Sequence, residues 1–345
     1  MRKLALAAAL LLAAAASAQS PRIIHATVTG VPAAGDLAAQ IRGARTPWVG
    51  YSVPAVDGNR VMCCFSQWGD FKSGGTCRLS DESSNFTNNH DDDDLHPAAG
   101  SVAVFYHLTD GAIDKIRVYS PDCMLDGTGT AVTWVDGVDP RRSVALLTSL
   151  VGGEKPVSRR ALTALAMHAE PSAGQRLEQW VRSSSTSDSI RGEAVFWLAE
   201  THPDTGFLAA RDLARDASAT RKLREKAIFA LQIVKTPAAI DELIHLARTD
   251  SDSHVRGQAI FWLSQAAGKK AAGAIREAVD NDPESEVREK AVFAMSQLPN
   301  DQGVPILIDL MKTHRDRNVR RKAAFWLGQS KDPRALNALE EILRR

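Results

Sequence analysis

The 345-residue chain has none of the short sequence signatures that mark the common catalytic sites. It contains no H-E-x-x-H zinc motif, no G-x-S-x-G nucleophile turn, no phosphate-binding glycine–lysine loop and no G-x-G-x-x-G dinucleotide motif. Lys and Arg together number 42 and Asp and Glu 41, so no excess of positive charge favours binding to a nucleic-acid backbone. These patterns predict no catalytic residue, no cofactor and no nucleic-acid partner.

Long hydrophobic runs are also missing, except for one at the N-terminus. Arg2 and Lys3 precede an apolar run from Leu4 to Ala16, and the small residues Ala16-Ser17-Ala18 come before Gln19. This pattern is typical of a bacterial secretory signal peptide, and the run is too short for a membrane-spanning helix. We therefore expect residues 1–18 to be removed and the mature protein to be periplasmic or secreted, without a membrane span.

Cysteine is absent from the second half of the chain. All four cysteines lie in the first half, at Cys63, Cys64, Cys77 and Cys123. The oxidising environment outside the cytoplasm favours disulfides in an exported domain. The absence of a C-x-x-C pair argues against a zinc site. Cys63 and Cys64 are adjacent on a predicted strand, so their side chains point to opposite faces and should not pair with each other. Two disulfides are expected, and two connectivities stay open.

Residues 19–140 differ in charge and pattern from the rest of the chain. They hold 8 basic and 15 acidic residues, against 32 and 26 in residues 141–345. A helix is predicted from Asp36 to Ile41, and the dipeptide Asp110-Gly111 predicts a hairpin. The segment thus predicts a small β or α+β domain that contains the disulfides. The strand-like runs are residues 23–29, 48–53, 60–65, 102–108, 113–120 and 131–135.

The second half of the chain repeats itself from residue 161 onward. One alanine recurs at spacings of 33, 33, 32, 32 and 32 residues, and five of the six copies share nearly the same apolar-periodic helix. Such a period is the sequence signature of a solenoid. The repeated alanines are Ala161, Ala194, Ala227, Ala259, Ala291 and Ala323, and the helices predicted around them cover residues 157–165, 190–198, 223–231, 255–263, 287–295 and 319–327.

A second apolar-periodic segment precedes each of the five clear copies, so each unit is predicted to be a helical hairpin. Stacked hairpins bury one another's apolar stripes, which predicts an α-solenoid over residues 141–345. A last helix from residue 335 to 345 has the charged surface of a cap. The preceding segments are residues 173–182, 206–214, 238–248, 271–280 and 303–312.

The repeats carry an aspartate followed by the pattern V-R-x-x-A-x-x-x-L. It stands here as Asp252 before Val255–Leu263 and as Asp282 before Val287–Met295. In this pattern, residues from about 143 to 345 resemble the HEAT family, in particular the HEAT-like repeats of phycobilisome lyases. The resemblance implies the fold and is weak evidence for activity. The related deoxyhypusine hydroxylases bind iron through His-Glu dipeptides, and none of the nine histidines here precedes Glu.

A phenylalanine occupies the same place in every clear repeat, roughly 150° around the helix from the middle of the buried stripe. In HEAT proteins this helix lines the concave surface, so the resemblance implies an aromatic strip there, edged by lysines and glutamines. Such a strip suits a protein or peptide partner, although rings packed between successive helices are an equal alternative. The proposed residues are Phe196, Phe229, Phe261, Phe293, Phe325, Lys226, Gln258, Lys290, Lys322, Gln265, Gln297 and Gln329.

Two further repeated positions are expected to be structural. The residue after each phenylalanine alternates between Trp and Ala and lies on the buried side of the wheel, which favours interdigitated packing. The repeated arginines are expected to pair with aspartates along the stack rather than to bind anions. The two sets are Trp197, Ala230, Trp262, Ala294 and Trp326, and Arg191, Arg224, Arg256, Arg288 and Arg320.

The sequence thus predicts an exported, non-enzymatic scaffold that binds a protein partner through its solenoid. The alternative is an enzyme, lyase- or oxidoreductase-like, or a metal-binding protein, whose site lies in the N-terminal domain around His90–His96. The run of four aspartates between these histidines has suitable ligands for a cation, but it lacks the alternating spacing of a calcium loop. We therefore favour a solvated loop there and expect no bound metal.

Overall fold

The computed structural model describes residues 21–56, 77–80, 100–121, 123–265 and 269–344, and the chain divides into two compact units. The first unit contains residues 1–150 and 167–170, and the second contains residues 151–166 and 171–345. The predicted boundary after residue 140 lies ten residues earlier than this division. The difference arises because helix α2 (Pro140–Leu150) packs in the first unit, against strand β3 (Trp48–Pro54) and helix α1 (Leu37–Arg42).

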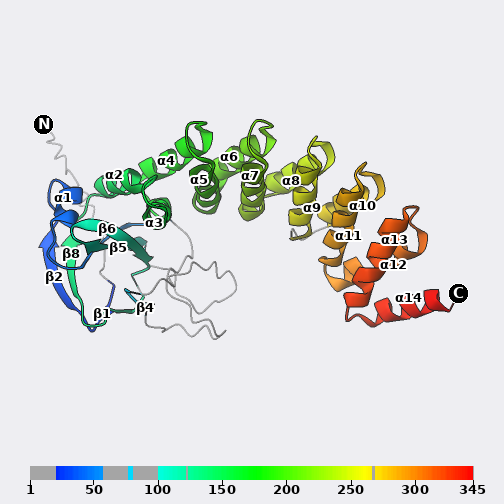
Figure 1. Ribbon diagram of the computed structural model, residues 1–345, viewed down its shortest axis with the longest axis horizontal. Helices are drawn as coiled ribbons and strands as arrows, with labels where there is room; N and C mark the ends of the chain where they lie inside the picture. The colour runs from blue at the N-terminus through cyan, green and yellow to red at the C-terminus, as the bar shows by residue number, and fades with distance from the viewer. Residues whose placement is uncertain (1–20, 57–76, 81–99, 122, 266–268, 345) are drawn as a thin grey trace, which may run out of the picture. The chain divides into compact units, whose positions relative to one another are not determined.

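The first unit is built on a mixed five-stranded sheet with the strand order β2-β8-β3-β5-β6 (Figure 1). Its other strands are β2 (Thr27–Pro32), β5 (Ser101–Thr109), β6 (Ala112–Tyr119) and β8 (Ala131–Asp136). β-branched and aromatic residues dominate β3, β5 and β8, which suits a pleated and largely buried surface. A smaller parallel sheet joins β1 (Ile23–Ile24), β7 (Leu125–Asp126) and β4 (Cys77–Arg78).

The predicted hairpin is present between β5 and β6. Asp110 and Gly111 both have positive φ, 52° and 76°, which is the backbone of a type I′ turn. The helix predicted from Asp36 is α1, and the carboxylate of Asp36 caps it by accepting the backbone N–H of Ala39 at 3.0 Å. The predicted hairpin turn and the predicted start of the helix are therefore both confirmed.

One hydrophobic core cluster of the first unit surrounds Phe105, Trp134 and Leu125. Cys77 and Cys123 lie in this core with 0% and 2% of their surfaces exposed, and neither is a free thiol. Cys63 and Cys64 lie outside the described residues, as does the predicted strand 60–65. The pairing of the four cysteines therefore stays a prediction.

The second unit is an α-solenoid of helical hairpins, as the repeat predicts (Figure 1). The second helices of the hairpins form one row, in which each packs against the next. Every predicted helix is present, and most extend one to three residues beyond the predicted range at both ends; α14 instead begins two residues earlier than predicted and ends at Leu343. The first helices are α4 (Pro171–Arg182), α6 (Pro203–Arg215), α8 (Pro237–Thr249), α10 (Lys269–Asn281) and α12 (Asn300–Thr313); the second helices are α3 (Lys155–Ala166), α5 (Asp188–Thr201), α7 (Arg221–Val234), α9 (Ser253–Gln265), α11 (Ser285–Ser296) and α13 (Arg317–Gln329), and α14 (Pro333–Leu343) comes last.

The predicted arginine–aspartate ladder is present for three of the five repeated arginines, whereas Arg191 and Arg320 donate to backbone carbonyl groups instead. Arg256 binds both carboxylate oxygens of Asp282, with N–O distances of 2.8 and 3.0 Å, and Arg288 binds Asp316 at 2.9 Å. Arg224 pairs in the same way with Asp250. Each aspartate lies just before the next second helix, so every pair joins two neighbouring repeats. The ladder fixes the stacking of the helices that carry the candidate site.

Candidate binding surface

The five repeated phenylalanines and three tryptophans form a continuous line of rings across helices α5 to α13. Phe196 stacks on Phe229 with ring centroids 6.0 Å apart and planes 15° apart, and Phe261 stacks on Phe293 at 6.2 Å and 5°. Tryptophans join or end these stacked pairs with centroid distances of 4.8 to 5.0 Å. This line is called the aromatic strip below, and its order is Trp197, Phe196, Phe229, Trp262, Phe261, Phe293, Trp326 and Phe325.

The alternation of Trp and Ala explains how the rings fit together. Where the residue after phenylalanine is Ala230 or Ala294, no bulky group separates two phenylalanines, and they stack directly. Where this residue is Trp262, its ring contacts Phe229 on one side and Phe261 on the other. The expected interdigitated packing is therefore present, and the tryptophans belong to the same strip as the phenylalanines.

The rings are neither fully buried nor fully exposed. The first four phenylalanines are half-buried, whereas Phe325 has 55% of its surface exposed. Trp197 is buried at 5% exposure, but Trp262 and Trp326 are half-buried, although the helical wheel predicts burial for all three. The wheel describes one helix, whereas the exposure of these rings is decided by the ring on the neighbouring helix. The phenylalanine rings thus pack between helices and keep part of their surface exposed, and their use as a binding surface stays a prediction.

The lysines beside the strip differ from one another in their partners. Lys290 pairs with Glu286 at 3.0 Å and Lys322 with Glu289 at 3.2 Å, whereas Lys226 is exposed and has no ion-pair partner among the described residues. Lys226 and Lys290 lie over glycines of the preceding second helix, where a Cβ atom at Gly257 would approach the Lys290 Cδ to 2.8 Å. The stems of these lysines thus cover the helix next to them.

The predicted glutamines form a second row beside the rings. Gln265, Gln297 and Gln329 are exposed, and Gln258 is half-buried. Each of the three exposed glutamines follows a phenylalanine by four residues, which places both on one face of their helix. The structure thus brings the predicted glutamines and aromatic rings together on helices α9, α11 and α13.

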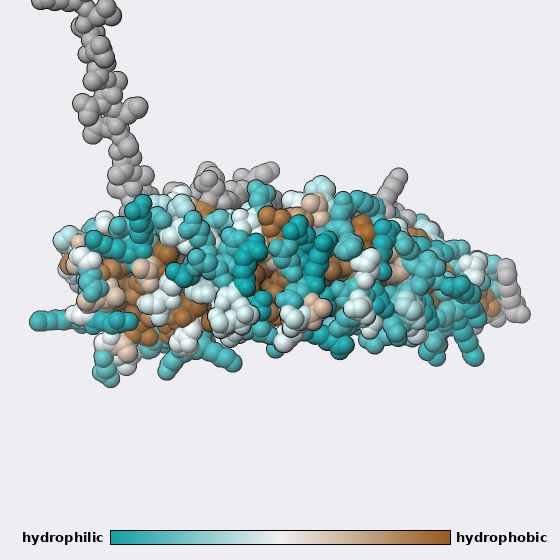
Figure 2. All heavy atoms as spheres, turned by 90° about the horizontal axis from the view of Figure 1, so that it is seen from above, coloured by the Kyte–Doolittle hydropathy of each residue, from teal (hydrophilic) through white to brown (hydrophobic). Residues whose placement is uncertain are grey.

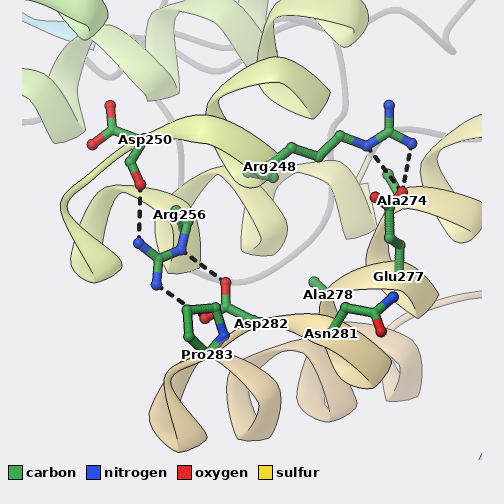
Figure 3. Close-up of a pocket in the computed structure, with 10 residues that line it drawn as sticks. Arg248, Asp250, Arg256, Ala274, Glu277, Ala278, Asn281, Asp282 and Pro283 are labelled. Atoms are coloured by element: carbon green, nitrogen blue, oxygen red, sulfur yellow. Dashed lines mark hydrogen bonds and ion pairs between the residues drawn. The ribbon is translucent and has the colours of Figure 1, made fainter.

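A pocket of about 190 Å³ lies elsewhere in the solenoid, between helices α8, α9 and α10 (Figure 3). Its charged residues already have partners in the protein, since Arg256 binds Asp282 and Arg248 binds Glu277 at 2.6 Å. The hydrogen bonds that Arg256 donates to the Asp282 carboxylate raise the pKa of its guanidinium, which therefore stays charged. These pairs belong to the contacts between repeats, and the pocket offers no unpaired charge for a ligand.

The first unit contains a buried chain of hydroxyl groups that the sequence analysis missed. The Tyr106 hydroxyl contacts the Tyr51 hydroxyl at 2.7 Å, Tyr51 contacts the Ser143 Oγ at 2.6 Å, and Ser143 contacts the His168 Nε2 at 2.7 Å. All four side chains are completely buried, so this serine and histidine meet no substrate. No motif could have revealed the chain, because its members come from two strands, one helix and a connecting segment.

The described part of the chain shows no group of three or more His, Cys, Asp or Glu residues that could hold a metal ion. The run His90–His96 lies outside the described residues, so the structure does not test it. None of the described helices is both long and apolar enough to cross a membrane. On the face shown in Figure 2, hydrophobic residues reach the surface only in patches among hydrophilic ones.

Comparison with known proteins identifies the repeat. A family model described as HEAT repeats matches residues 179–264 and 272–345. No curated protein matches the chain significantly.

Several solved structures also match part of the chain. They include human deoxyhypusine hydroxylase in complex with glycerol (19% identity, 59% of this chain and 89% of that chain, TM-score 0.26). The Escherichia coli protein YibA is 18% identical over 59% of this chain and 82% of that chain, with a TM-score of 0.36. The CpcE–CpcF complex of phycocyanin lyase from Nostoc sp. PCC7120 is 20% identical over 50% of this chain and 70% of that chain, with a TM-score of 0.34. These similarities are too low to transfer an activity, but the match to the repeat model agrees with the hairpin stack. The solenoid is therefore identified as a stack of HEAT-like repeats.

Proposed function

We propose that this chain is an exported, non-enzymatic scaffold whose solenoid binds a protein partner along the aromatic strip. The observation that carries the proposal is the continuous line of rings, half-buried along most of its length and exposed at Phe325. Rings that neighbours hold in place lose little side-chain entropy on binding and still offer apolar area. HEAT repeats typically mediate protein interactions, which supports the same use of this surface.

Export is the second part of the proposal. It is supported by the N-terminal pattern of Arg2 and Lys3, an apolar run and Ala16-Ser17-Ala18. Disulfides among Cys63, Cys64, Cys77 and Cys123 are proposed on the same basis, because an oxidising compartment favours them. The alternative site at His90–His96 gains no support from the described residues. Elemental analysis of the purified mature protein tests it, since a stoichiometric metal would favour that alternative.

Photo-crosslinking in the cells that produce the protein tests the binding surface. A photoreactive amino acid at Gln297 lies beside the aromatic strip, whereas the same amino acid at Gln179 lies on the first-helix row, on α4. We expect a discrete crosslinked protein from position 297 and none from position 179. Equal crosslinking at both positions, or none at 265, 297 and 329, would contradict the proposal.

A second variant separates binding from folding. Phe325 ends the strip, contacts Trp326 at a centroid distance of 5.0 Å and is 55% exposed. Replacing an exposed ring costs little stability, so Phe325→Ser should unfold within about 0.5 kcal/mol of the wild type. If the strip binds the partner, crosslinking from position 297 should nevertheless fall in this variant.

A further inference from the structure

Two of the three exposed glutamines beside the strip are held in a defined orientation. Gln265 donates its Nε2 to the Ser264 Oγ at 3.2 Å, and the Ser264 hydroxyl donates to the carbonyl oxygen of Phe261 at 2.6 Å. Gln297 and Ser296 repeat this arrangement at 3.0 and 2.7 Å. Each amide thereby keeps one N–H and its carbonyl oxygen for a ligand. Two fixed amides on neighbouring helices are suited to hydrogen bonding with a polypeptide backbone.

The spacing of the row favours one backbone conformation. Packed helices lie about 8–10 Å apart, and three residues of a polyproline II helix rise about 9.3 Å. Because this helix has three residues per turn, every third residue returns to the same face. A β-strand covers the distance with about three residues but alternates its faces, and an α-helix needs about six residues, which is not a whole number of turns. Only the polyproline II period matches successive glutamines.

Polyproline II also matches the chemistry of the strip. It has no internal hydrogen bonds, so its carbonyl groups are free to accept the glutamine N–H groups. Proline rings pack well on aromatic side chains, and the conformation is already ordered before binding. The exposed ring edges and the neighbouring amides therefore fit one segment together.

The charged residues on helices α7, α9, α11 and α13 indicate which side chains the ends of a bound polyproline II segment should carry. Every carboxylate on α7, α9, α11 and α13 is paired within the protein, since Glu225 binds His254, Glu286 binds Lys290 and Glu289 binds Lys322. Among the described residues, Lys222 and Lys226 on α7 and Arg321 on α13 have no carboxylate partner, and all three are exposed. Unpaired positive charge thus lies on α13, at one end of the row of glutamines, and on α7, one helix before the other end. Helices α7 and α13 are three helix steps apart, about 24–30 Å, which corresponds to eight to ten polyproline II residues.

We infer that the solenoid binds an extended, proline-rich segment of a partner protein in the polyproline II conformation, with an acidic residue near each end. This inference rests on the proposed function and specifies the chemistry of the partner. The glutamines bind the backbone, the rings pack against the prolines, and the basic residues of α7 and α13 bind the acidic ends.

Fluorescence anisotropy with labelled peptides tests the inference. The probe is a peptide of nine prolines with a glutamate at each end, and the comparison peptides are the same chain with terminal lysines and a strand-forming Thr-Val peptide with terminal glutamates. We expect the first probe to bind more tightly than either comparison peptide. The double variant Gln265→Ala/Gln297→Ala should weaken its binding at least about fivefold, because two hydrogen bonds are lost.

The matched control is Gln175→Ala/Gln179→Ala, which removes two exposed amides from α4 and should leave binding unchanged. Circular dichroism should show that both double variants are folded. The inference is overturned if the proline probe does not bind, if the Thr-Val peptide binds as tightly, or if the two double variants bind alike. If crosslinking from position 297 persists in any of these cases, the proposed function stands and only the polyproline II segment is rejected. If crosslinking also fails, both are rejected.

Discussion

The phenol groups of Tyr51 and Tyr106 lie completely inside the first unit, where water cannot solvate their ionised forms. Burial raises the pKa of Tyr51 to about 12 against its usual value of 10, and burial also raises that of Tyr106 well above 10. Both groups therefore stay protonated in the folded protein over the whole physiological range. Their role is to complete hydrogen bonds that reach Ser143 and His168.

The first prediction concerns alkaline pH. A tyrosine whose pKa is higher in the folded state binds its proton more tightly there, so its contribution to stability is complete below pH 10. That contribution is lost as the pH rises from 10 towards the folded pKa of about 12. The free energy of unfolding, measured with urea between pH 9 and 12, should decrease as the pH rises. This decrease should be smaller in Tyr51→Phe. An equal decrease in the variant would show that other groups control alkaline unfolding.

The second prediction concerns the serine in the same chain. Ser143→Ala leaves the buried Tyr51 hydroxyl and the His168 Nε2 each without one partner, which should lower the free energy of unfolding by about 1–3 kcal/mol. The control is Ser149→Ala on the same helix, because Ser149 is exposed and its hydroxyl donates to the carbonyl oxygen of Leu146. Urea denaturation measures both. A loss no greater than that of Ser149→Ala would mean that the chain contributes little to folding.

At the scale of the helices, two rows of ion pairs join neighbouring repeats, and they differ in burial. The third prediction compares them at one junction. Arg256 and Asp282 have 9% and 4% of their side chains exposed, whereas Arg248 and Glu277 have 51% and 46%. Asp282→Asn leaves a buried guanidinium without its counter-charge and should cost about 3 kcal/mol. Glu277→Gln should cost less than about 1 kcal/mol. Thermal denaturation of both variants measures this difference, and equal costs would show that the buried ladder does not stabilise the stack.

The fourth prediction tests the alternation of Trp and Ala in the strip. Ala294 is completely buried, and the stacked pair Phe261–Phe293 lies beside it. Ala294→Trp inserts a ring where the two phenylalanines stack directly, so overpacking should destabilise the solenoid by about 1–3 kcal/mol. Trp262→Ala instead removes the ring between Phe229 and Phe261 and leaves a gap. If either variant melts at the wild-type temperature, the alternation does not determine packing.

The helices were predictable because the same apolar pattern recurs in every repeat. The predictions fail where contacts between elements decide packing and burial. The two-residue strands β4 and β7 are too short to show a period, and α2 resembles the solenoid helices although it packs on β3. The candidate surface was predicted in its composition but not in its burial. Ring contacts between helices, and pairs such as Lys290 with Glu286, depend on the stacking geometry, which a helical wheel does not contain.

At the scale of the whole molecule, the two units are stabilised by different means. The solenoid has no cysteine and depends on apolar stripes and ion pairs that recur from one repeat to the next. All four cysteines belong to the first unit, where Cys77 and Cys123 lie in the core. A reductant should therefore act on one unit only.

The fifth prediction follows from this division. Differential scanning calorimetry should resolve two unfolding transitions, because each unit has its own core. Reduction of native disulfides in a small domain costs about 2–5 kcal/mol, so dithiothreitol should lower one transition by roughly ten degrees or more. The other transition should coincide with loss of the helical circular dichroism signal at 222 nm and should not move. Thiol counting after denaturation without reductant should find no free thiol, and four free thiols would contradict the proposed disulfides. A shift of both transitions would instead show that the solenoid depends on the first unit for its stability.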